Sequence, residues 1–397
     1  ISVQPDALAG ESAAAKCARL AAGLKAAGQS AAIITLPDSI AWLLNIRGSD
    51  IERNPVVQAF AILHDTAHVT LFIAAEKLGE AVRAHLGPDV TIRPPSAFAP
   101  ALRTLGGTVR VDPATAPVEV SRELAEAGLA IAHAPDPCIL PKALKNAAEL
   151  AGMRAAHLRD GAAMVEFLAW LDATAPGGGL TEIDVVTKLE GFRRATNALK
   201  EISFETICGT GPNGAVIHYR VTEETNRPLR PGEIVVIDSG GQYQDGTTDI
   251  TRTVSIGPVD PEAKAAFTRV LQGMIAISRL RWPRGLTGAH LDALARYPLW
   301  LAGQDYDHGT GHGVGCYLSV HEGPQRLSRA TDVVLEPGMV LSNEPGYYRE
   351  GAFGIRIENL VVVQEAPDLP GGDAHRRMLE CETLTWVPID RRLIDAD

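Results

Sequence analysis

The sequence has few cysteines and no cysteine pair with a metal-binding or redox spacing. Its five cysteines are scattered along 397 residues, and none form a Cys-x-x-Cys pair. An odd, dispersed set is typical of reduced thiols and argues against a disulfide framework or a thiolate zinc site. We therefore expect a cytoplasmic protein whose cysteines are buried bystanders.

Long apolar runs and an excess of positive charge are also missing. No apolar run in the sequence approaches the roughly 20 residues that a helix needs to cross a bilayer. The net charge of −11 argues against nucleic-acid binding, which needs a basic face. The chain begins with Ile1 and shows no basic segment followed by an apolar core, so we expect a mature or cut product without a signal peptide. We expect neither a membrane nor a nucleic acid as partner.

The first third of the chain alternates helix-like and strand-like patterns. Ser12 is a good N-cap for an alanine-rich helix that ends at Gly28, and Ala31 to Leu36 reads as a buried strand. Further strand-like runs follow at 60–63, 69–73, 109–111 and 129–132. This alternation predicts an α/β layer domain.

Three prolines, Pro135, Pro137 and Pro141, mark a boundary after this region. We predict an α/β domain over residues 1–136. The second domain, over residues 137–397, should mix helices with antiparallel strands, because a long amphipathic helix starting near Asn146 is followed by strand-like runs.

An internal echo in the second domain predicts two related halves. Leu229 to Gly232 is followed by an apolar run and then Asp238, and Leu335 to Gly338 is followed by an apolar run and then Glu344. Both stretches have the form turn, strand, carboxylate. A weak repeat of this kind indicates two halves that face each other and supply an acid each to a shared centre.

A glycine-rich stretch, Gly309 to Gly315, contains His312 and is flanked by His308 and His321. It is too rich in glycine for a helix interior, and glycine allows the backbone to approach a ligand closely. A lone histidine is more often structural than functional. Three of them beside a glycine-rich run favour a binding site.

Four acids at strand-like positions complete this candidate site: Asp238, Asp249, Glu344 and Glu358. An acid within a β-branched run is costly unless it is paired or ligated. Together with His312, the four carboxylates form a mixed oxygen and nitrogen set suited to divalent cations.

Two hairpins would bring these acids together. A tight turn at Asp245–Gly246 puts Asp238 and Asp249 on one face, about four residues out of step. A three-residue loop near Gly351 sets Glu344 and Glu358 opposite each other.

Two cations roughly 3.5–4 Å apart and bridged by such acids would lower the pKa of a water and polarise a carbonyl. The ligand set favours manganese or magnesium, with cobalt or zinc as alternatives. Structural calcium is the other interpretation, and it leaves the spare histidines unexplained. His218, His308 and His321 would then hold substrate or move protons. Arg356 shares a strand face with Glu358 and would help keep that acid ionised.

Seven stretches together resemble the pita-bread metallopeptidases, which include methionine aminopeptidase, prolidase, aminopeptidase P and the metal-free creatinase. The resemblance is greatest to the cytosolic Xaa-Pro aminopeptidases. The stretches are 40–50, 236–240, 248–253, 308–315, 320–324, 343–348 and 354–359. The resemblance implies a creatinase-like α/β N-terminal domain followed by an α+β pita-bread catalytic domain with pseudo-twofold halves. It also implies that the chain lacks the first domain and the tail of the family's long form.

The resemblance implies a role for each candidate residue. The expected ligands of two metal ions, typically manganese, are Asp238, Asp249, His312, Glu344 and Glu358. Of these, Asp249 and Glu358 would bridge the ions, and Glu344 would also accept a proton. His218, His308 and His321 would line the substrate site, and Arg356 would lie behind the metals.

The implied activity is release of the N-terminal residue from peptides with proline in the second position. The alternatives are a prolidase restricted to Xaa-Pro dipeptides and a non-catalytic peptide-binding scaffold of the same fold. The expected partners are the peptide substrate and a second copy of the chain in a homodimer.

Overall fold

The computed structural model describes residues 1–373 and 375–396. These form two compact units. The first comprises residues 1–142 and 146–149, and the second comprises residues 143–145 and the chain from residue 150 onward. The domain boundary between residues 136 and 137 stays a prediction.

The first unit is built on a six-stranded mixed sheet with the order β6-β5-β4-β2-β7-β8. Its strands are β2 (Ala31–Ile34), β4 (Phe60–His64), β5 (Val69–Phe72), β6 (Val90–Arg93), β7 (Thr108–Val111) and β8 (Ala130–His133). A short pair, β1 (Ser2–Val3) and β3 (Ile46–Arg47), lies outside this sheet. The helices are α1 (Asp6–Ala9), α2 (Ala13–Ala26), α3 (Pro37–Leu43), α4 (Glu80–Leu86), α5 (Phe98–Leu102) and α6 (Val118–Glu126). The predicted α/β class is confirmed.

Local signals placed the first long helix correctly. The Ser12 hydroxyl accepts a hydrogen bond from the backbone N–H of Ala15 at 3.2 Å, as expected of an N-cap. At the other end, Gly28 has a φ of 68°, which glycine adopts without the steric cost that other residues meet.

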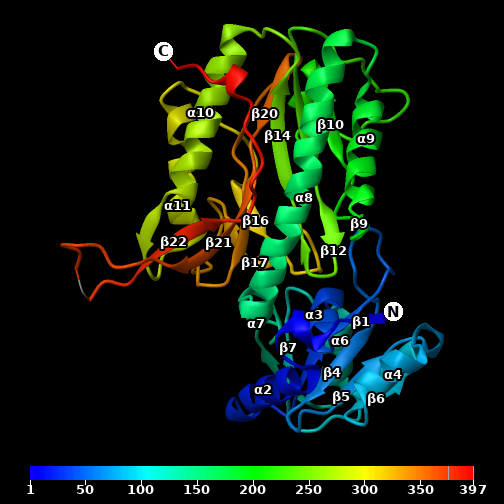
Figure 1. Cartoon of the computed structure of the whole chain (residues 1–397). Coiled ribbons are helices and arrows are strands. Elements are labelled where there is room, and N and C mark those ends of the chain that lie inside the picture. Colours follow the sequence, from blue (N-terminus) through cyan, green and yellow to red (C-terminus); the bar gives the residue numbers. More distant parts are fainter. Residues whose placement is uncertain (374, 397) are drawn as a thin grey trace. The chain divides into compact units, whose positions relative to one another are not determined.

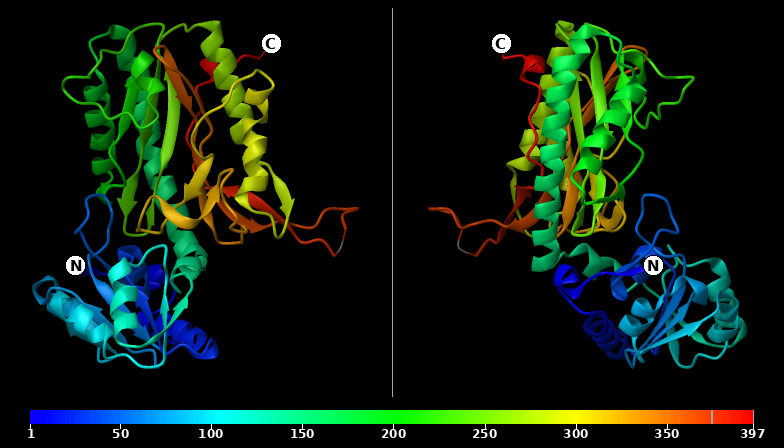
Figure 2. Two further views of the ribbon diagram at one scale, coloured as in Figure 1. Left: turned by 180° about the vertical axis from the view of Figure 1, so that it is seen from behind. Right: turned by 45° about the vertical axis from the view of Figure 1, so that its right-hand side comes forward.

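Two helices lead from the first unit into the second: α7 (Ile139–Ala143) and α8 (Ala147–Thr174). The other long helices of the second unit are α9 (Glu182–Ala195), α10 (Pro261–Ser278) and α11 (Gly288–Trp300). Figures 1 and 2 show α8 and α9 running along the strands of one half, and α10 and α11 along those of the other. Among the described residues, no helix combines the length and apolar character needed to span a membrane.

The described residues of the second unit form four sheets. The first half has β10-β11-β14 and β13-β12-β9, and the second half has β15-β22-β21-β18-β16-β17 and β19-β20. The strands of the first half are β9 (Leu199–Ile202), β10 (Ile207–Thr210), β11 (Ile234–Ser239), β12 (Gly241–Tyr243), β13 (Gly246–Thr247) and β14 (Ile250–Ser255). Those of the second half are β15 (Arg281–Pro283), β16 (Gly311–Gly313), β17 (Glu322–Leu327), β18 (Val340–Asn343), β19 (Gly346–Arg349), β20 (Phe353–Arg356), β21 (Asn359–Glu365) and β22 (Met378–Thr383).

Each half has its own apolar core. Phe167 of α8 and Leu189 of α9 pack with Val235 and Ile237 of β11. In the second half, Ala295 of α11 belongs to a cluster with residues of β18, β21 and β22. Helices therefore pack against the strands of each half, as the predicted α+β architecture requires.

The repeat seen in the sequence corresponds to matching structural positions. Thr181 precedes α9 and bridges to Pro228, while Thr287 precedes α11 and bridges to Val334. The same spacing along the chain separates Thr181 from Thr287, Pro228 from Val334 and Asp238 from Glu344. The expectation of two related halves is confirmed.

The first-half hairpin differs from its predicted register. Strand β12 pairs with β13 so that Tyr243 lies opposite Gly246, which makes Gln244–Asp245 the turn, one residue earlier than predicted. The predicted offset of about four residues was therefore wrong. Asp238 pairs with Thr251, so Asp249 lies only two residues from the position opposite Asp238. Gly246 serves packing instead: an added Cβ would lie 3.0 Å from the side chains of Met153 and Ala156 on α8.

The second-half hairpin has the predicted register. Arg349 pairs with Phe353, which leaves a three-residue loop at 350–352. The same register continues to the pair Asn343 and Asn359, so Glu344 and Glu358 stand opposite each other between the two ladders.

Candidate metal centre

The four acids lie where the two long hairpins pass from one sheet to the next. Asp238 is near the end of β11 and Asp249 comes just before β14, while Glu344 follows β18 and Glu358 precedes β21. Asp238 is itself paired with Thr251, and the ladders end beside the four acids, where one sheet gives way to the next. Acids of both halves, Asp238, Asp249 and Glu344, line one cavity.

The candidate ligands converge in space. Asp249, His312 and Glu358 each offer a ligand atom within 4.8 Å of the others. His312 Nε2 also lies 3.3 Å from Glu344 Oε1 and 3.5 Å from Asp249 Oδ2. Asp238 lines the same cavity, which has a volume of about 410 Å³. The structure thus brings all five together, although their role as ligands stays a prediction.

Two buried carboxylate oxygens in this cluster have no hydrogen-bond partner among the described residues: Asp238 Oδ1 and Glu358 Oε1. Buried polar atoms are nearly always satisfied, and an orphaned carboxylate oxygen needs an explanation. A bound divalent cation would explain both unpartnered oxygens. The donor set of four carboxylates and an imidazole fits two such ions.

Electrostatic repulsion in the cluster leads to the same conclusion. Burial raises the pKa of the Asp249 carboxyl well above its ordinary value, and the charges of Asp238 and Glu344 raise it further. Burial and then the charge of Asp249 do the same to the pKa of Glu358. Burial also raises the pKa of Glu344. Acids that disfavour one another's ionised forms are stabilised by added positive charge.

The glycine-rich stretch makes room for a neighbouring strand. A Cβ on Gly311 would lie 1.9 Å from the carbonyl oxygen of Ser342, and a Cβ on Gly313 would lie 2.6 Å from that of Glu322. Only glycine lets β16 run this close to its neighbours. His312 between them is held by its backbone N–H, which donates to Ser342 Oγ at 2.9 Å.

His308 ends a chain of hydrogen bonds that begins at Asp238. Arg356 donates to Asp238 Oδ2 and to the Tyr348 hydroxyl oxygen, each at 2.7 Å. His308 Nδ1 lies 2.7 Å from the Gly309 carbonyl, so it carries the proton, and Nε2 accepts from the Tyr348 hydroxyl at 2.9 Å. Burial, and then the charge of Arg356, lower the pKa of His308 to about 3. This imidazole is neutral at physiological pH.

The other two predicted histidines also line the cavity. The His321 ring lies 4.2 Å from that of His312, centroid to centroid. Burial and the His312 ring lower the pKa of His321 to about 4, so it too is neutral at pH 7. His218 lies on the loop before β11 and reaches the same cavity.

Sequence reasoning missed two features of the cavity. Tyr348 was not singled out, although β-strand alternation from Glu344 would have put it on the same face. Phe204, Ile207 and Ile217 form an apolar wall. No motif marks that wall, because its residues come from separate segments.

Comparison with known proteins agrees with this geometry. Residues 151–365, more than half of the chain, match metallopeptidase family M24. The chain belongs to metallopeptidase family M24. Residues 1–149 match the creatinase/prolidase N-terminal domain, so the predicted pairing of a creatinase-like domain with a pita-bread domain is confirmed.

Two proteins similar to this chain are named as aminopeptidases. A protein of Aspergillus fumigatus named probable Xaa-Pro aminopeptidase P is 42% identical over 410 residues, which cover 100% of this chain and 62% of the relative. The crystal structure of an X-prolyl aminopeptidase from Caenorhabditis elegans, described as a cytosolic enzyme with a di-nuclear active site, matches with a TM-score of 0.92 and 36% identity. The match covers 99% of this chain and 65% of that one.

An Xaa-Pro dipeptidase from Bacillus anthracis shares the fold, with a TM-score of 0.76 and 24% identity. That match covers 95% of this chain and 99% of the dipeptidase. The present chain thus spans nearly the whole length of the dipeptidase but only about 62% of the length of the curated relative from Aspergillus fumigatus.

Proposed function

We propose that this chain is the core of a dinuclear metal-dependent aminopeptidase that releases the N-terminal residue from peptides with proline in second position. The observation that carries the proposal is the convergence of four carboxylates and His312 with two carboxylate oxygens left unpartnered. The names of the relatives support the substrate class.

Asp238, Asp249, His312, Glu344 and Glu358 would hold two divalent cations, with Asp249 and Glu358 shared between them. When bound, such ions lower the pKa of a water and act as Lewis acids on a carbonyl. The predominance of carboxylate oxygen favours manganese, with cobalt, zinc or magnesium as alternatives.

Glu344 is the proton acceptor in this proposal. It is partly accessible from the cavity, and burial raises its pKa, which makes the carboxylate a better proton acceptor. Ser342 Oγ donates to Glu344 Oε1 at 2.9 Å and holds the side chain in place. The carboxyl group would pass its proton to the leaving proline nitrogen.

The histidines act as hydrogen-bonding groups in this scheme. A neutral imidazole, as at His308 and His321, can bond a peptide carbonyl without bringing positive charge to the cluster. His218 and His321 would orient the scissile peptide, and His308, held by Tyr348 and Gly309, would complete that side of the cavity.

The cavity suits a short peptide with a free amino terminus. The cluster of acids attracts the α-ammonium group, and this restricts cleavage to the end of a chain. The apolar wall of Phe204, Ile207 and Ile217 offers a surface for the proline ring.

A second candidate function, hydrolysis of Xaa-Pro dipeptides, is favoured by Arg326. This residue lines the same cavity and lies opposite His312 in the β16–β17 ladder. A guanidinium there would bond the free carboxylate of a dipeptide.

Side-by-side hydrolysis of Xaa-Pro-Pro and Xaa-Pro separates these functions. The measurement uses metal-stripped protein before and after addition of Mn²⁺. We expect tripeptide cleavage that returns with the metal. Activity on the dipeptide alone would favour the prolidase alternative. Uptake of metal without cleavage of either peptide would favour the non-catalytic scaffold.

Two further proposals concern the state of the protein in the cell. The five cysteines are free thiols, four of them buried, which supports a reducing, cytoplasmic location. A homodimer is proposed on the resemblance alone, and size-exclusion chromatography with light scattering measures it.

A further inference from the structure

Arg252 is a buried guanidinium immediately beside the candidate metal centre. It lies on β14, three residues after Asp249, and is only 2% exposed. An arginine offers five N–H donors in a rigid planar fork. All five find acceptors here, and each acceptor is an uncharged oxygen.

These acceptors belong to three segments that are far apart in the sequence. Nη1 donates to the backbone oxygens of Thr251 (2.9 Å) and Glu358 (2.6 Å). Nη2 donates to Asn359 Oδ1 (2.9 Å) and to the Val387 oxygen (2.8 Å), and Nε donates to the Pro388 oxygen (3.0 Å). One side chain thus joins β14, the residue Glu358 and the segment after β22.

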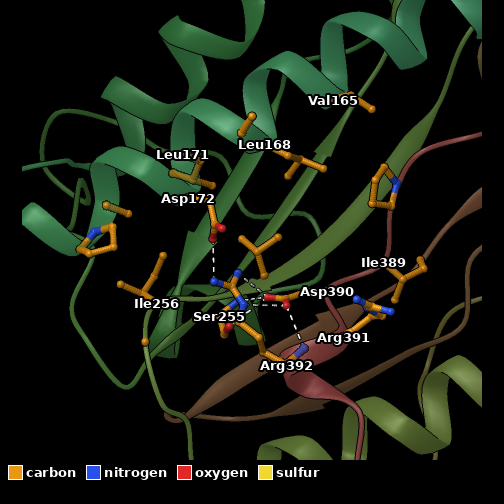
Figure 3. Close-up of a pocket in the computed structure, with 16 residues that line it drawn as sticks. Val165, Leu168, Leu171, Asp172, Ser255, Ile256, Ile389, Asp390, Arg391 and Arg392 are labelled. Atoms are coloured by element: carbon orange, nitrogen blue, oxygen red, sulfur yellow. Dashed lines mark hydrogen bonds and ion pairs between the residues drawn. The ribbon is translucent and has the colours of Figure 1, made fainter.

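We call residues 384–393 the C-terminal strap. At its start, the backbone N–H of Leu384 donates to the Leu360 oxygen, and Leu360 N–H donates to Thr385 Oγ1, each at 2.9 Å. At its end, Asp390 accepts from the N–H and hydroxyl of Ser255 at 2.9 Å, as Figure 3 shows beside a cavity of about 480 Å³. The strap is therefore anchored on β21 at Leu360, two residues after Glu358, and on β14 at Ser255.

Glu358 depends on β14 for its position. Its backbone N–H donates to the Thr251 oxygen at 3.1 Å, and its carboxylate Oε2 accepts from Thr251 Oγ1 at 2.8 Å. Its backbone oxygen accepts from Arg252. Two consecutive residues of β14 thus hold the backbone N–H, the backbone oxygen and one carboxylate oxygen of Glu358, leaving Oε1 for a cation.

We propose that Arg252 is a positioning residue of the metal centre, which couples the seating of the C-terminal strap to the orientation of Glu358. This inference rests on the proposed metal centre. Removing groups that orient metal ligands typically weakens metal binding by about 10- to 100-fold. Lysine keeps the charge but is a flexible point donor and cannot reproduce the fork.

The test is a calorimetric titration of metal-stripped protein with Mn²⁺. In Arg252→Lys we expect Mn²⁺ affinity to fall about 10- to 100-fold. KM for Xaa-Pro-Pro should stay unchanged, because Arg252 is not among the residues that line the substrate cavity. At limiting Mn²⁺ kcat should fall, and saturating Mn²⁺ should restore part of it.

The matched control is Arg193→Lys. Arg193 is also fully buried, but it pairs with Asp160 at 2.8 Å and makes no bond to Glu358. It should lower thermal stability with little change in Mn²⁺ affinity. A second variant, Thr385→Val, changes only the strap and should weaken Mn²⁺ binding in the same direction by a smaller factor. Combined with Arg252→Lys, it should add less than its separate effect, because both changes loosen the same strap.

The outcomes separate the two proposals. If the unmodified protein takes up no Mn²⁺, the metal centre itself is refuted. If it binds Mn²⁺ and Arg252→Lys binds equally well, the positioning role is overturned, even where stability falls. Unchanged Mn²⁺ affinity in Thr385→Val would show that the strap does not influence the metal centre. This variant also tests the proposal if Arg252→Lys fails to fold.

Discussion

The two halves of the second unit follow one plan and end in different chemistry. In each, a threonine precedes a helix, a Pro-Gly turn leads into a strand, and that strand ends near an acid. The first half supplies aspartates at 238 and 249, whereas the second supplies glutamates at 344 and 358. A repeated scaffold therefore sets the positions, and side-chain length adjusts each acid to the shared cavity.

The single histidine of the cluster is the largest difference between the halves. Gly313 pairs with Leu341 in the second half, and Thr210 pairs with Val235 at the matching ladder position of the first. The counterpart of His312 is thus Gly209. A Cβ on Gly209 would lie 2.8 Å from the backbone nitrogen of Gly214, so the first half has no space for a side chain there.

Each half also holds an acid of the other. Asp238 of the first half is bonded by Arg356 of the second, and Glu358 of the second is bonded by Thr251 of the first. Asp238 and Glu358 are thus each held by the opposite half. The site therefore belongs to the interface between the halves.

Removing a shared acid from either half should have the largest effect. In Asp249→Ala and in Glu358→Ala we expect turnover of Xaa-Pro-Pro to fall by about 10³-fold or more, because charge stabilisation at the reacting centre is lost. Metal content, measured by atomic emission spectrometry, should fall in both. Full activity in Asp249→Ala would end the dinuclear proposal, and unequal effects would show that the halves do not share the site evenly.

Histidines from the two halves should affect turnover without affecting the metals. His218→Ala in the first half and His308→Ala in the second should each lower kcat by about 10²-fold, the usual cost of losing a positioned proton-transfer or hydrogen-bonding group. Metal content should stay at the unmodified level. Loss of metal in His308→Ala would instead make that histidine a ligand.

The repulsion among the acids predicts an unusual effect on stability. The raised pKa of Asp249 means that the folded metal-free protein keeps a proton which the unfolded chain releases near pH 4. Stability should therefore fall as the pH rises from about 4 through the folded-state pKa.

Asp249→Asn removes this titration. At pH 8 the metal-free variant should be more stable than the unmodified protein by about 1–3 kcal/mol, and the difference should shrink toward pH 4. Thermal unfolding of metal-stripped samples measures it, with Glu223→Gln on an exposed loop as the control. Added Mn²⁺ should reverse the order. A variant less stable at pH 8 would show that repulsion is not what the metals relieve.

The helix caps should give the smallest effects. Thr181 and Asp184 form a capping box in which the acid accepts the Thr181 N–H at 2.8 Å, while in the second half His290 Nδ1 accepts the Thr287 N–H at 3.2 Å. Loss of a cap costs about 1 kcal/mol, and hydrogen bonds to a charged group are the stronger ones. The Thr181 hydroxyl bonds the Asp184 carboxylate at 2.7 Å, whereas the Thr287 hydroxyl bonds the His290 ring at 2.9 Å. Thr181→Ala should therefore cost more than Thr287→Ala in urea denaturation, with activity unchanged in both. An equal or reversed cost would show that the carboxylate does not strengthen the first cap.

Local patterns were sufficient where the determinants are close in sequence. The cap of Ser12, the hairpin loop at 350–352 and the repeat before Asp238 and Glu344 all follow from the residue types of short segments. Candidate acids could be recognised because a carboxylate at the end of an apolar strand needs a partner.

The remainder depended on contacts that short segments do not encode. The turn at Gln244–Asp245 was misplaced because Gly246 is required by its packing against α8. Tyr348 gained its role from a bond to His308. Arg252 gained its own from oxygens on β21 and on the strap.

The sequence by itself determined which residue types are available for the site, the two-half plan and the α/β and α+β classes of the units. Only the tertiary structure decided which oxygen atoms meet, which remain unpartnered and which side chains hold the others in place. The physical reason is range. Helix, strand and turn preferences act between neighbouring residues, whereas the site is formed by ladders and hydrogen bonds between segments about a hundred residues apart, such as that from Thr251 to Glu358.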